Sequence, residues 1–355
     1  MTDQRIRVLV VDDSVVVRML VAEALNADPD LELAGLAHNG KAALDKAAVV
    51  KPDVVVLDVE MPVMDGLETL KELRARDKRL PVVMFSTLTA RGTSTTVEAL
   101  THGASDYVTK PSTSNRDQSV QVLREELLPK LKALGARRRS APPVAARVPA
   151  PARSRAHAPV EAVVIGISTG GPNALAEMLP MLPADLPVPV LVVQHMPPMF
   201  TRLLAQRLDK ACALSVGEAV GGEVLSPGQI WIAEGGKHLV VTRREGALVL
   251  ATHEGPPVNS CRPAVDVLFD SAAQVFGRGV LAVVMTGMGQ DGLRGSEGIR
   301  AAGGQVICQD EESSVVWGMP RFVAERGVAE AVVPLEDIAR EITRRVGSRR
   351  PLVTT

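Results

Sequence analysis

Apolar stretches alternate with stretches of helical periodicity along the first half of the chain. Five apolar runs predict β-strands, and helical spacing of apolar residues follows between them. The predicted strands cover residues 6–11, 31–37, 54–57, 81–85 and 106–109, and the predicted helices cover residues 15–26, 40–50, 67–76 and 95–103. Regular alternation of strand and helix is typical of a parallel, doubly wound sheet. The first half therefore predicts a five-stranded α/β domain.

The second half shows the same alternation with one interruption. Predicted strands cover residues 163–167, 188–193, 279–285 and 305–308, and helices are expected to end near 178–182 and to cover 200–208, 264–276, 320–325 and 335–346. Between about 218 and 252, glycine-rich turns separate the alternating strands 229–233, 238–242 and 247–251, with a hairpin turn at Glu245-Gly246. We expect a doubly wound α/β domain whose parallel sheet has an antiparallel hairpin extension.

A compositional break separates the two halves. No acidic residue occurs between Glu126 and Glu161, and the intervening tract is rich in alanine, proline and arginine, including Arg137 to Arg139. Such a tract cannot form a core, and its prolines favour extended conformations. Its basic residues could attract nucleic acid or a membrane, but a solvated linker is favoured. We predict domains at 1–127 and 160–350, joined by a linker at 128–159.

Composition narrows the possible classes of function. The formal net charge is −1 and aromatic residues make up 2% of the chain, which argues against nucleic-acid binding. The three cysteines lie far apart and form no CxxC pair, which favours a reducing compartment. The chain opens with polar residues and has no apolar run long enough to cross a membrane. We expect a cytoplasmic protein without membrane insertion.

Polar residues in the first half fall just beyond the carboxyl ends of predicted strands. These residues are Asp12, Asp13, Asp58, Ser86 and Lys110. Ligands of doubly wound sheets bind in the crevice at these strand ends. Three carboxylates there repel one another unless a hard cation such as Mg²⁺ joins them. Phosphoryl transfer needs a nucleophile, a cation and a hydroxyl, which Asp58, Lys110 and Ser86 with Mg²⁺ would supply. Each residue alone could instead be a helix cap, a turn residue or a solvated charge.

The strand at 163–167 runs directly into Ser168, Thr169, Gly170 and Gly171. The G-x-S-x-G spacing fits a nucleophile elbow, in which a serine hydroxyl is exposed on a sharp strand-to-helix turn. Glycines relieve crowding in such a turn, and the following Pro172 suits the first turn of a helix. The alternative is an ordinary strand-to-helix turn that happens to hold a serine.

His195 and Asp291 also follow predicted buried strands, so the same crevice should gather them with Ser168. Histidine can take the serine proton, and a carboxylate can orient the histidine. The order Ser, His, Asp differs from that of the α/β-hydrolases. His195 could instead be a core histidine, and Asp291 a helix N-cap before Gly292. Cys261 with His253 could suggest a thiol nucleophile instead, but their Pro/Gly-rich loop has no elbow.

Four segments of the first half resemble the response-regulator receiver family, which has a flavodoxin-like fold. These are VVDDS, VLDVEMPVMDG, VVMFST and YVTKP, within residues 5–127. The resemblance implies that a partner histidine kinase phosphorylates Asp58, with Mg²⁺ held by Asp12, Asp13 and Asp58. It assigns Ser86 and Lys110 to the phosphorylation switch, and Tyr107 stands where the family has its switch aromatic.

Five further segments resemble the protein-glutamate methylesterases of bacterial chemotaxis, the CheB family: GISTGG, QHMP, RPAVDVLF, VVMTGMGQDG and VVWGMP. The resemblance implies hydrolysis of glutamate γ-methyl esters on methyl-accepting chemoreceptors, and suggests deamidation of receptor glutamines. It makes Ser168 the nucleophile, His195 the base and Asp291 its orienter. It also places an oxyanion-binding N–H at Met288, gives Thr169 an elbow position, requires no cofactor in the esterase site and favours a monomer.

We therefore expect an esterase controlled by phosphorylation, with the unphosphorylated receiver covering the crevice that holds Ser168. A receiver fused to a DNA-binding output is disfavoured, because residues 160–355 show no helix-turn-helix pattern and no basic or aromatic recognition surface. A nucleotide-binding second domain is the stronger alternative, because glycines after a strand can cradle phosphate. Its expected G-x-G-x-x-G pattern is absent, and it would leave His195 and Asp291 without a role.

Overall fold

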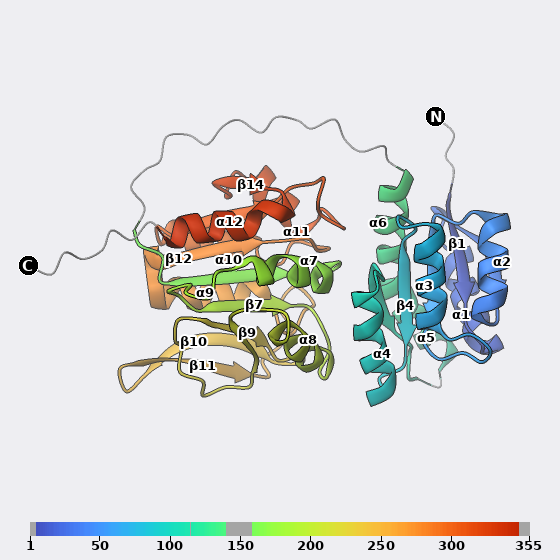
Figure 1. Ribbon diagram of the computed structural model, residues 1–355, viewed down its shortest axis with the longest axis horizontal. Coiled ribbons are helices and arrows are strands. Elements are labelled where there is room, and N and C mark those ends of the chain that lie inside the picture. Colours follow the sequence, from blue (N-terminus) through green and yellow to red (C-terminus); the bar gives the residue numbers. More distant parts are fainter. Residues whose placement is uncertain (1–4, 114, 140–157, 348–355) are drawn as a thin grey trace, which may run out of the picture. The chain divides into compact units, whose positions relative to one another are not determined.

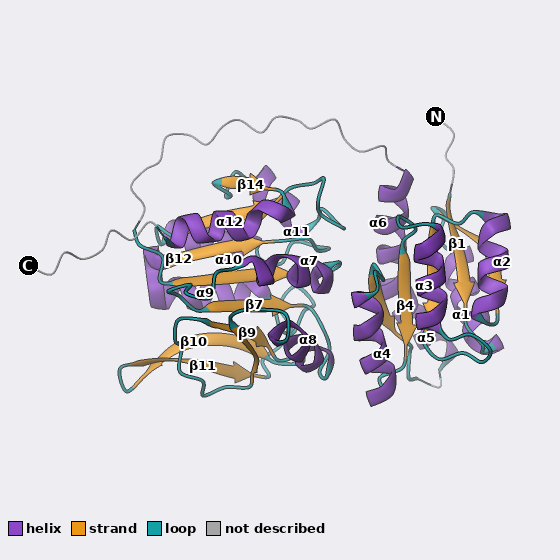
Figure 2. Cartoon of the chain, in the orientation of Figure 1, coloured by secondary structure: helices purple, strands orange, loops and turns teal. Residues whose placement is uncertain are grey.

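The computed structural model describes residues 5–113, 115–139 and 158–347. The described residues form two compact units, which divide between 139 and 158. In both units, helices cover the faces of a central sheet (Figures 1 and 2). Within the described ranges, no helix combines the length and the apolarity needed to cross a membrane.

The first unit is a five-stranded parallel sheet with strand order β2-β1-β3-β4-β5. Its strands are β1 (Ile6–Val11), β2 (Leu31–Ala37), β3 (Val54–Asp58), β4 (Val82–Ser86) and β5 (Asp106–Thr109). Its helices are α1 (Val15–Asn26), α2 (Gly40–Val50), α3 (Gly66–Arg76), α4 (Ala90–Thr101), α5 (Arg116–Val122) and α6 (Leu128–Arg139), with a π-helical turn, η1 (Leu123–Leu127), between the last two. This confirms the predicted receiver-type fold.

Helix α4 begins at Ala90, five residues before the predicted start at 95. Thr89 caps it, because its side chain accepts a hydrogen bond from the backbone N–H of Gly92. The first turn, Ala-Arg-Gly-Thr, carries too few apolar residues to show helical periodicity in the sequence. The cap therefore fixes a start that hydrophobic spacing does not reveal.

Residues 128–139, predicted as the start of the linker, form helix α6 instead. Leu128, Leu131 and Leu134 are buried at helical spacing. A Cβ on Gly135 would lie 2.3 Å from Ile6 Cγ2, so this helix packs closely against the start of β1. The remaining linker residues, 140–157, lie outside the described residues.

The basic residues of α6 pair with acidic residues of the first unit rather than remaining unpaired in solvent. Lys130 contacts Asp106 at 3.0 Å, and Arg138 contacts Asp77 at 2.7 Å. Arg139 lies 3.6 Å from an oxygen of Asp53. Composition alone suggested a solvated tract, because the acidic partners are distant in the sequence.

The second unit contains a seven-stranded sheet of order β14-β13-β12-β6-β7-β9-β8, in which all pairs are parallel. Its strands are β6 (Ala162–Ile167), β7 (Val190–Gln194), β8 (Ser215–Ala219), β9 (Gln229–Ala233), β12 (Val280–Val284), β13 (Gln305–Gln309) and β14 (Ala331–Val333). Its helices are α7 (Gly171–Met178), α8 (Phe200–Asp209), α9 (Val265–Phe276), α10 (Leu293–Ala301), α11 (Met319–Glu325) and α12 (Leu335–Val346), with short 3-10 turns η2 (Leu179–Met181) and η3 (Gly277–Gly279). The doubly wound prediction is confirmed.

The antiparallel hairpin is present, but it is a separate two-stranded sheet rather than an extension of the large one. It consists of β10 (His238–Arg244) and β11 (Ala247–His253), and Glu245 and Gly246 form its turn with positive φ. Strand β9, predicted as antiparallel, instead pairs in parallel with β7 and β8. Alternating polarity identified the strands but could not identify their partners.

Strand β6 lies near the centre of the large sheet, between β7 and β12. The chain therefore leaves three adjacent parallel strands at the same sheet edge. Gly166 allows helix α9 to pack closely beneath β6, since a Cβ there would lie 2.3 Å from Val265 Cγ1. This packing sets the start of α9 beside the strand ends where the site is built.

Candidate active site and phosphorylation site

Ser168 follows β6 at a sharp turn. Its N–H donates to the Thr286 carbonyl at 3.0 Å, and its own carbonyl accepts from the Gly171 N–H at 2.8 Å. Gly170 has a φ of +78°, and α7 begins at Gly171 with Pro172 in its first turn. Ser168 is half-buried, and its hydroxyl makes no hydrogen bond to any described residue. Ser168 therefore lies on a strand-to-helix turn of the expected kind, and its role as a nucleophile stays a prediction.

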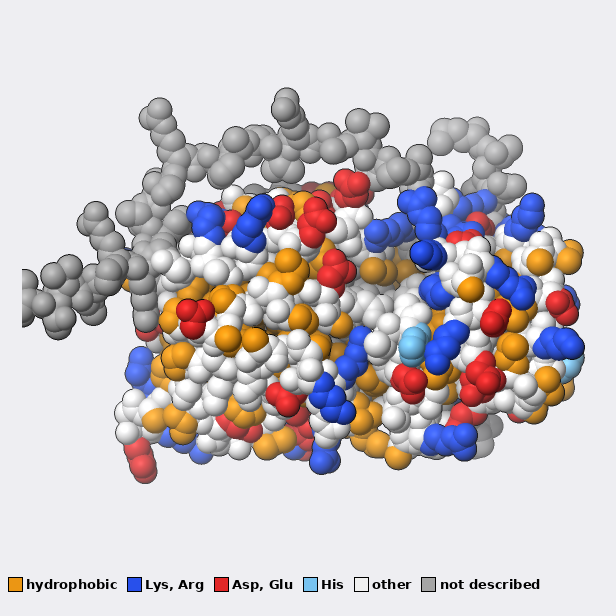
Figure 3. Space-filling view, in the orientation of Figure 1, with side chains coloured by type: hydrophobic (Ala, Val, Ile, Leu, Met, Phe, Trp, Pro, Cys, Tyr) orange, Lys and Arg blue, Asp and Glu red, His pale blue; other side chains and the backbone are white. Residues whose placement is uncertain are grey.

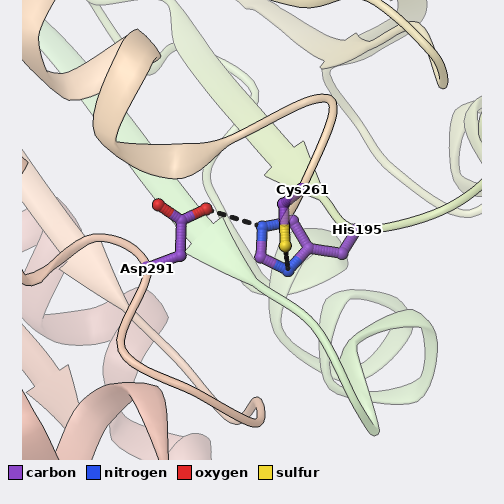
Figure 4. Close-up of side chains that lie close together, drawn as sticks. All are labelled: His195, Cys261 and Asp291. Atoms are coloured by element: carbon purple, nitrogen blue, oxygen red, sulfur yellow. Dashed lines mark hydrogen bonds and ion pairs between the residues drawn. The ribbon is translucent and has the colours of Figure 1, made fainter. Parts of the chain in front are cut away.

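His195 follows β7 as Ser168 follows the neighbouring strand β6. Strands β6 and β7 pair Ile167 with Gln194, and the His195 N–H donates to the Ile167 carbonyl at 3.2 Å. His195 Nε2 is 2.8 Å from Asp291 Oδ2 (Figure 4). A carboxylate only accepts hydrogen bonds, so Nε2 carries the proton. The structure thus brings together His195, which directly follows β7, and Asp291, which lies in the loop between β12 and α10.

The second ring nitrogen of His195, Nδ1, faces Cys261, a residue that the sequence disfavours as a nucleophile. Cys261 Sγ lies 3.6 Å from His195 Nδ1, and both side chains are half-buried (Figure 4). His253, the partner considered for Cys261, instead accepts a hydrogen bond at Nδ1 from the Gly255 N–H. Cys261 therefore contacts the same histidine as Asp291 rather than forming a second pair.

Asp291 caps a helix, but not the one predicted. Its Oδ2 accepts from the Val265 N–H at 2.7 Å and its Oδ1 accepts from the Asp266 N–H at 3.0 Å, so it caps α9. The sequence suggested that it would cap the helix after Gly292. That helix, α10, is capped instead by Asp266, whose Oδ1 accepts from the N–H groups of Gly292 and Gly295. Asp291, which lies just before α10, thus caps α9, and Asp266, in the first turn of α9, caps α10.

Asn259 joins the two aspartates. Its Nδ2 donates to Asp266 Oδ2 at 2.9 Å and to Asp291 Oδ1 at 2.8 Å. Its φ of 52° is left-handed, a conformation for which asparagine is enriched. Sequence reasoning missed Asn259 because it follows no strand. Its place shortly before the RPAVDVLF segment is the available signal, but only the fold shows that it reaches Asp291.

These contacts set the charge of the histidine–aspartate pair. Burial alone would lower the pKa of His195, but hydrogen bonds with Asp291 and Cys261 and their charges raise it to about 9. Burial alone would raise the pKa of Asp291, but the His195 contact and the backbone N–H groups of Val265 and Asp266 hold it below its usual value. The pair therefore favours imidazolium and carboxylate together.

Two further predicted residues lie at the same sheet edge. A Cβ on Gly287 would lie 2.8 Å from Ser168 Cβ, so the loop that carries Met288 passes directly against the serine. Within the described residues the Met288 N–H makes no hydrogen bond, which leaves it available to an oxyanion. Thr169 is buried, and its carbonyl accepts a hydrogen bond from Thr286 Oγ1 at 2.9 Å. Its backbone thus ties the elbow to the loop after β12.

In the first unit, the predicted acidic residues also meet. Asp12, Asp13 and Asp58 each offer an oxygen within 4.8 Å of the others. Lys110 Nζ lies 2.8 Å from Asp12 Oδ2 and 2.8 Å from Asp58 Oδ1. Asp12 and Asp58 are buried, and Asp13 is exposed. Three carboxylates with one exposed side suit a hard cation with oxygen ligands.

The charges of this acidic cluster are poorly compensated. Burial, and then the charge of Asp12, raise the pKa of Asp58 to about 6 despite Lys110. Burial likewise raises the pKa of Asp12. Burial would lower the pKa of Lys110, but its two carboxylate partners raise it. The cluster therefore has a deficit of positive charge that a divalent cation would fill.

The remaining switch residues are buried near the ends of β4 and β5. Ser86 ends β4, and its hydroxyl donates to the Thr87 carbonyl at 3.1 Å. Its carbonyl accepts from the Lys110 N–H at 2.7 Å, which links it to the lysine of the cluster. Tyr107 is buried, and Lys130 Nζ lies 5.3 Å from its ring centroid.

Comparison with known families gives one match to each unit. Residues 163–342 match the family described as CheB methylesterase. Residues 8–121 match the response regulator receiver domain. The two matches fall on the two units of the structure.

Close relatives match over nearly their whole length. A protein-glutamate methylesterase/protein-glutamine glutaminase of Trichodesmium erythraeum is 45% identical, with 97% of this chain and 99% of that protein covered. A protein of the same name from a Nocardioides species is 50% identical, with 98% and 97% covered. Both proteins therefore share the complete two-unit organisation.

A solved structure matches the second unit. The CheB methylesterase catalytic domain of Thermotoga maritima is 42% identical and superposes with a TM-score of 0.51, covering 53% of this chain and 99% of that one. Almost the whole of that catalytic domain therefore matches about half of this chain.

Proposed function

Because the chain belongs to the CheB methylesterase family and carries a receiver domain, we propose that it hydrolyses glutamate γ-methyl esters on methyl-accepting chemoreceptors and deamidates receptor glutamines. The observation that carries this proposal is the His195–Asp291 hydrogen bond at the end of β7, the strand that pairs with the one leading into Ser168. The names of the relatives suggest the substrate class, and the site contains a serine, a histidine and an aspartate that can carry out the hydrolysis.

In the proposed reaction, Ser168 Oγ attacks the carbonyl carbon of the ester while His195 takes its proton. Asp291 holds Nε2, so Nδ1 is the nitrogen left to accept that proton. His195 then returns the proton to the methoxy oxygen, and methanol leaves. Water, deprotonated by the same histidine, hydrolyses the glutamyl ester of Ser168. With a glutamine substrate, ammonia leaves in place of methanol.

The carbonyl oxygen gains negative charge during the attack, and backbone N–H groups can stabilise it. We assign this role to the Met288 N–H, which has no hydrogen-bond partner among the described residues. Removing one such donor typically costs about 2.7–4 kcal/mol of transition-state stabilisation. Thr169, whose carbonyl is tied to Thr286, would hold the elbow at a fixed distance from this loop.

For the first unit, we propose that a histidine kinase phosphorylates Asp58 and that this raises esterase activity. Asp12, Asp13 and Asp58 would hold Mg²⁺, which neutralises charge on the incoming phosphoryl group. Lys110 already contacts Asp12 and Asp58 and would pair with the phosphate oxygens. Ser86 would turn its hydroxyl from the Thr87 carbonyl toward the phosphate, and the buried Tyr107 would follow this change.

The face of the molecule seen in Figure 3 gives no reason to prefer a nucleic-acid partner. On the face seen in Figure 3, lysine and arginine side chains are interspersed with aspartate and glutamate over both units. Nucleic-acid sites usually gather basic side chains on one face. Chemoreceptors and a kinase remain the partners that the proposal requires.

The test is methanol release from methylated receptor, with and without acetyl phosphate and Mg²⁺. We expect Ser168→Ala to abolish release, Asp58→Ala to lose the response to acetyl phosphate, and Ser215→Ala, at an exposed serine that begins β8, to behave as the unmodified chain. Ammonia release from a glutamine-bearing receptor tests the deamidase in parallel. Methanol release that persists in Ser168→Ala would contradict the assignment of the nucleophile.

One observation supports a second nucleophile. Cys261 Sγ lies near Nδ1, the nitrogen that would activate a nucleophile. Cys261 stands in a loop rather than at an elbow, so we favour Ser168. Loss of release in Cys261→Ala together with retention in Ser168→Ala would reverse this choice.

A further inference from the structure

Cys261 transfers no proton in the proposed ester hydrolysis, yet its contact with His195 joins two strong metal ligands. Cys261 Sγ and His195 Nδ1 are 3.6 Å apart. Thiolate sulfur and imidazole nitrogen are the preferred ligands of Zn²⁺ in proteins. The two side chains come from different elements, one from the loop after β7 and one from the loop before α9, so the fold alone creates this pair.

The separation of the two atoms fits coordination to one ion. Zn²⁺ binds sulfur at about 2.3 Å and nitrogen at about 2.1 Å in tetrahedral geometry, which places two such ligands roughly 3.6 Å apart. The observed distance is 3.6 Å. A zinc ion could therefore replace the thiol proton between Sγ and Nδ1 without a change of backbone.

Asp291 completes the arrangement from the other side of the ring. It accepts the Nε2 proton at 2.8 Å and is itself held by the N–H groups of Val265 and Asp266. Metal-binding histidines usually donate their second N–H to a carboxylate, which fixes the ring and strengthens the ligand. Asp291 thus holds the Nε2 proton, and once the imidazolium has lost its other proton the lone pair of Nδ1 faces Cys261.

We propose that His195 Nδ1 and Cys261 Sγ form a Zn²⁺ site that inhibits the esterase. The nitrogen lone pair and the thiolate bind the ion, the thiol proton and the Nδ1 proton of the imidazolium pass to water, and no oxidation or reduction takes place. Water molecules fill the remaining coordination positions. His195 cannot accept the Ser168 proton while Nδ1 holds zinc. The inhibition rests on the proposed function, whereas the binding site does not.

The acidic cluster of the first unit gives this site a contrast within the same chain. Asp12, Asp13 and Asp58 offer only oxygen atoms, which suit Mg²⁺. The pair of sulfur and nitrogen suits zinc and not magnesium. Excess Mg²⁺ should therefore occupy the acidic cluster and leave the Cys261–His195 pair free for zinc.

The experiment measures Zn²⁺ binding to the full chain by equilibrium dialysis in excess Mg²⁺. Cys212→Ala is the matched control, because Cys212 is also half-buried but lies near Asp209 instead of a histidine. Losing an outer-shell partner alone costs roughly 10–100-fold in metal affinity, so we expect Cys261→Ala to weaken binding at least about tenfold. Cys212→Ala should bind as the unmodified chain does. Equal affinity in the two variants would overturn the site.

Two further readouts separate the site from its effect. Co²⁺ in place of zinc should give a thiolate-to-metal charge-transfer band in the full chain and in Cys212→Ala, but not in Cys261→Ala. Methanol release, measured for each variant against its own zinc-free rate, should fall with zinc at concentrations that match the dialysis. Zinc bound at Cys261 without a fall in rate would overturn the inhibition. A chain inactive without zinc would contradict the proposed function, while dialysis would still report on the site.

Discussion

Asp58 and Asp291 both lie at the carboxyl edge of a parallel sheet, yet their pKa values are shifted in opposite directions. The pKa of Asp58 is raised to about 6, chiefly by burial. The pKa of Asp291 is lowered although burial opposes this. Both aspartates are almost fully buried, so depth below the surface does not explain the difference.

The difference lies in their partners. Asp58 shares Lys110 with Asp12, and its one backbone donor, the Glu60 N–H, is 3.4 Å away. Asp291 accepts hydrogen bonds from the backbone N–H groups of Val265 and Asp266 in α9 and from the N–H of Gly292, which follows it in the chain. The side chains of Asn259 and His195 donate two more. Hydrogen bonds to a carboxylate favour its charged form.

The acidic cluster around Asp58 lacks enough positive charge to balance its carboxylates, whereas the carboxylate of Asp291 has its hydrogen-bond donors within the fold. The acidic cluster needs a cation before it can hold a phosphoryl group, which suits a switch. The Asp291 site has its partners built into the fold, which suits a base that must keep one orientation through every turnover. The following predictions test this distinction.

The largest effect is expected for Asp291→Asn. The amide would present the wrong donor pattern to His195, and such changes cost roughly 10⁴-fold in kcat. Methanol release from methylated receptor gives the rate. Asp270→Asn is the control, since Asp270 lies on α9, the helix that Asp291 caps, but contacts Arg294. Similar rates in both variants would contradict the orienting role of Asp291.

Lys110→Ala should remove the response to acetyl phosphate, a loss of up to about two orders of magnitude in stimulated rate. Without Lys110, Asp12 and Asp58 lose an ammonium group that contacts both carboxylates. Lys132→Ala, which removes ion pairs with Asp28 and Asp30, should retain the response. A full response in Lys110→Ala would show that the cluster needs no fixed cation.

Asn259→Ala should lower kcat roughly tenfold with little change in KM, because losing a hydrogen bond to a charged group costs about 1.5–3 kcal/mol. Asp266 and Asp291 would then face each other without the shared N–H₂ group. Asn259→Asp keeps the size but adds a third carboxylate, and should be worse than Asn259→Ala. The opposite order would mean that Asn259 only fills space.

The pH dependence of the esterase should report the pKa of His195. The serine needs a neutral imidazole, and the pKa of His195 is about 9, so kcat/KM should rise from pH 7 toward pH 9. Cys261→Ala removes one contact that raises this pKa, so its profile should move to lower pH. Rates would be measured in chelator-treated buffer. A flat profile between pH 7 and 9 would exclude His195 as the base.

Asp58→Asn should stabilise the first unit at pH 7. The folded pKa of Asp58, about 6, lies above its ordinary 3.8, so the folded state is favoured at low pH and loses this advantage as pH rises through 6. A shift of this size corresponds to roughly 1–3 kcal/mol. Hydrogen exchange of peptides from β3 in the full chain would measure it. The exposed Asp13→Asn should have little effect, and the gain should vanish near pH 4.

Much of the fold could be predicted because local patterns and tertiary packing agree. The strands at 106–109 and 229–233 and the helices at 40–50 and 335–346 have the predicted bounds. The predictions failed where local signals were weak or partners were distant. The polar start of α4, the basic residues of α6 and the parallel pairing of β9 all depend on contacts that the sequence does not display.

Periodicity along the chain is sufficient to predict the alternation of strands and helices and the residues that follow each strand. That was enough to select Asp12, Asp58, Lys110, Ser168 and His195, because parallel strands of one sheet share an edge. The surroundings of these residues depend on contacts between segments that are distant in the sequence. Asn259 and Cys261 follow no strand, and they reach Asp291 and His195 because the loop before α9 folds back over that edge. Periodicity reports which face of an element is buried, whereas hydrogen bonds between loops depend on the path of the whole chain.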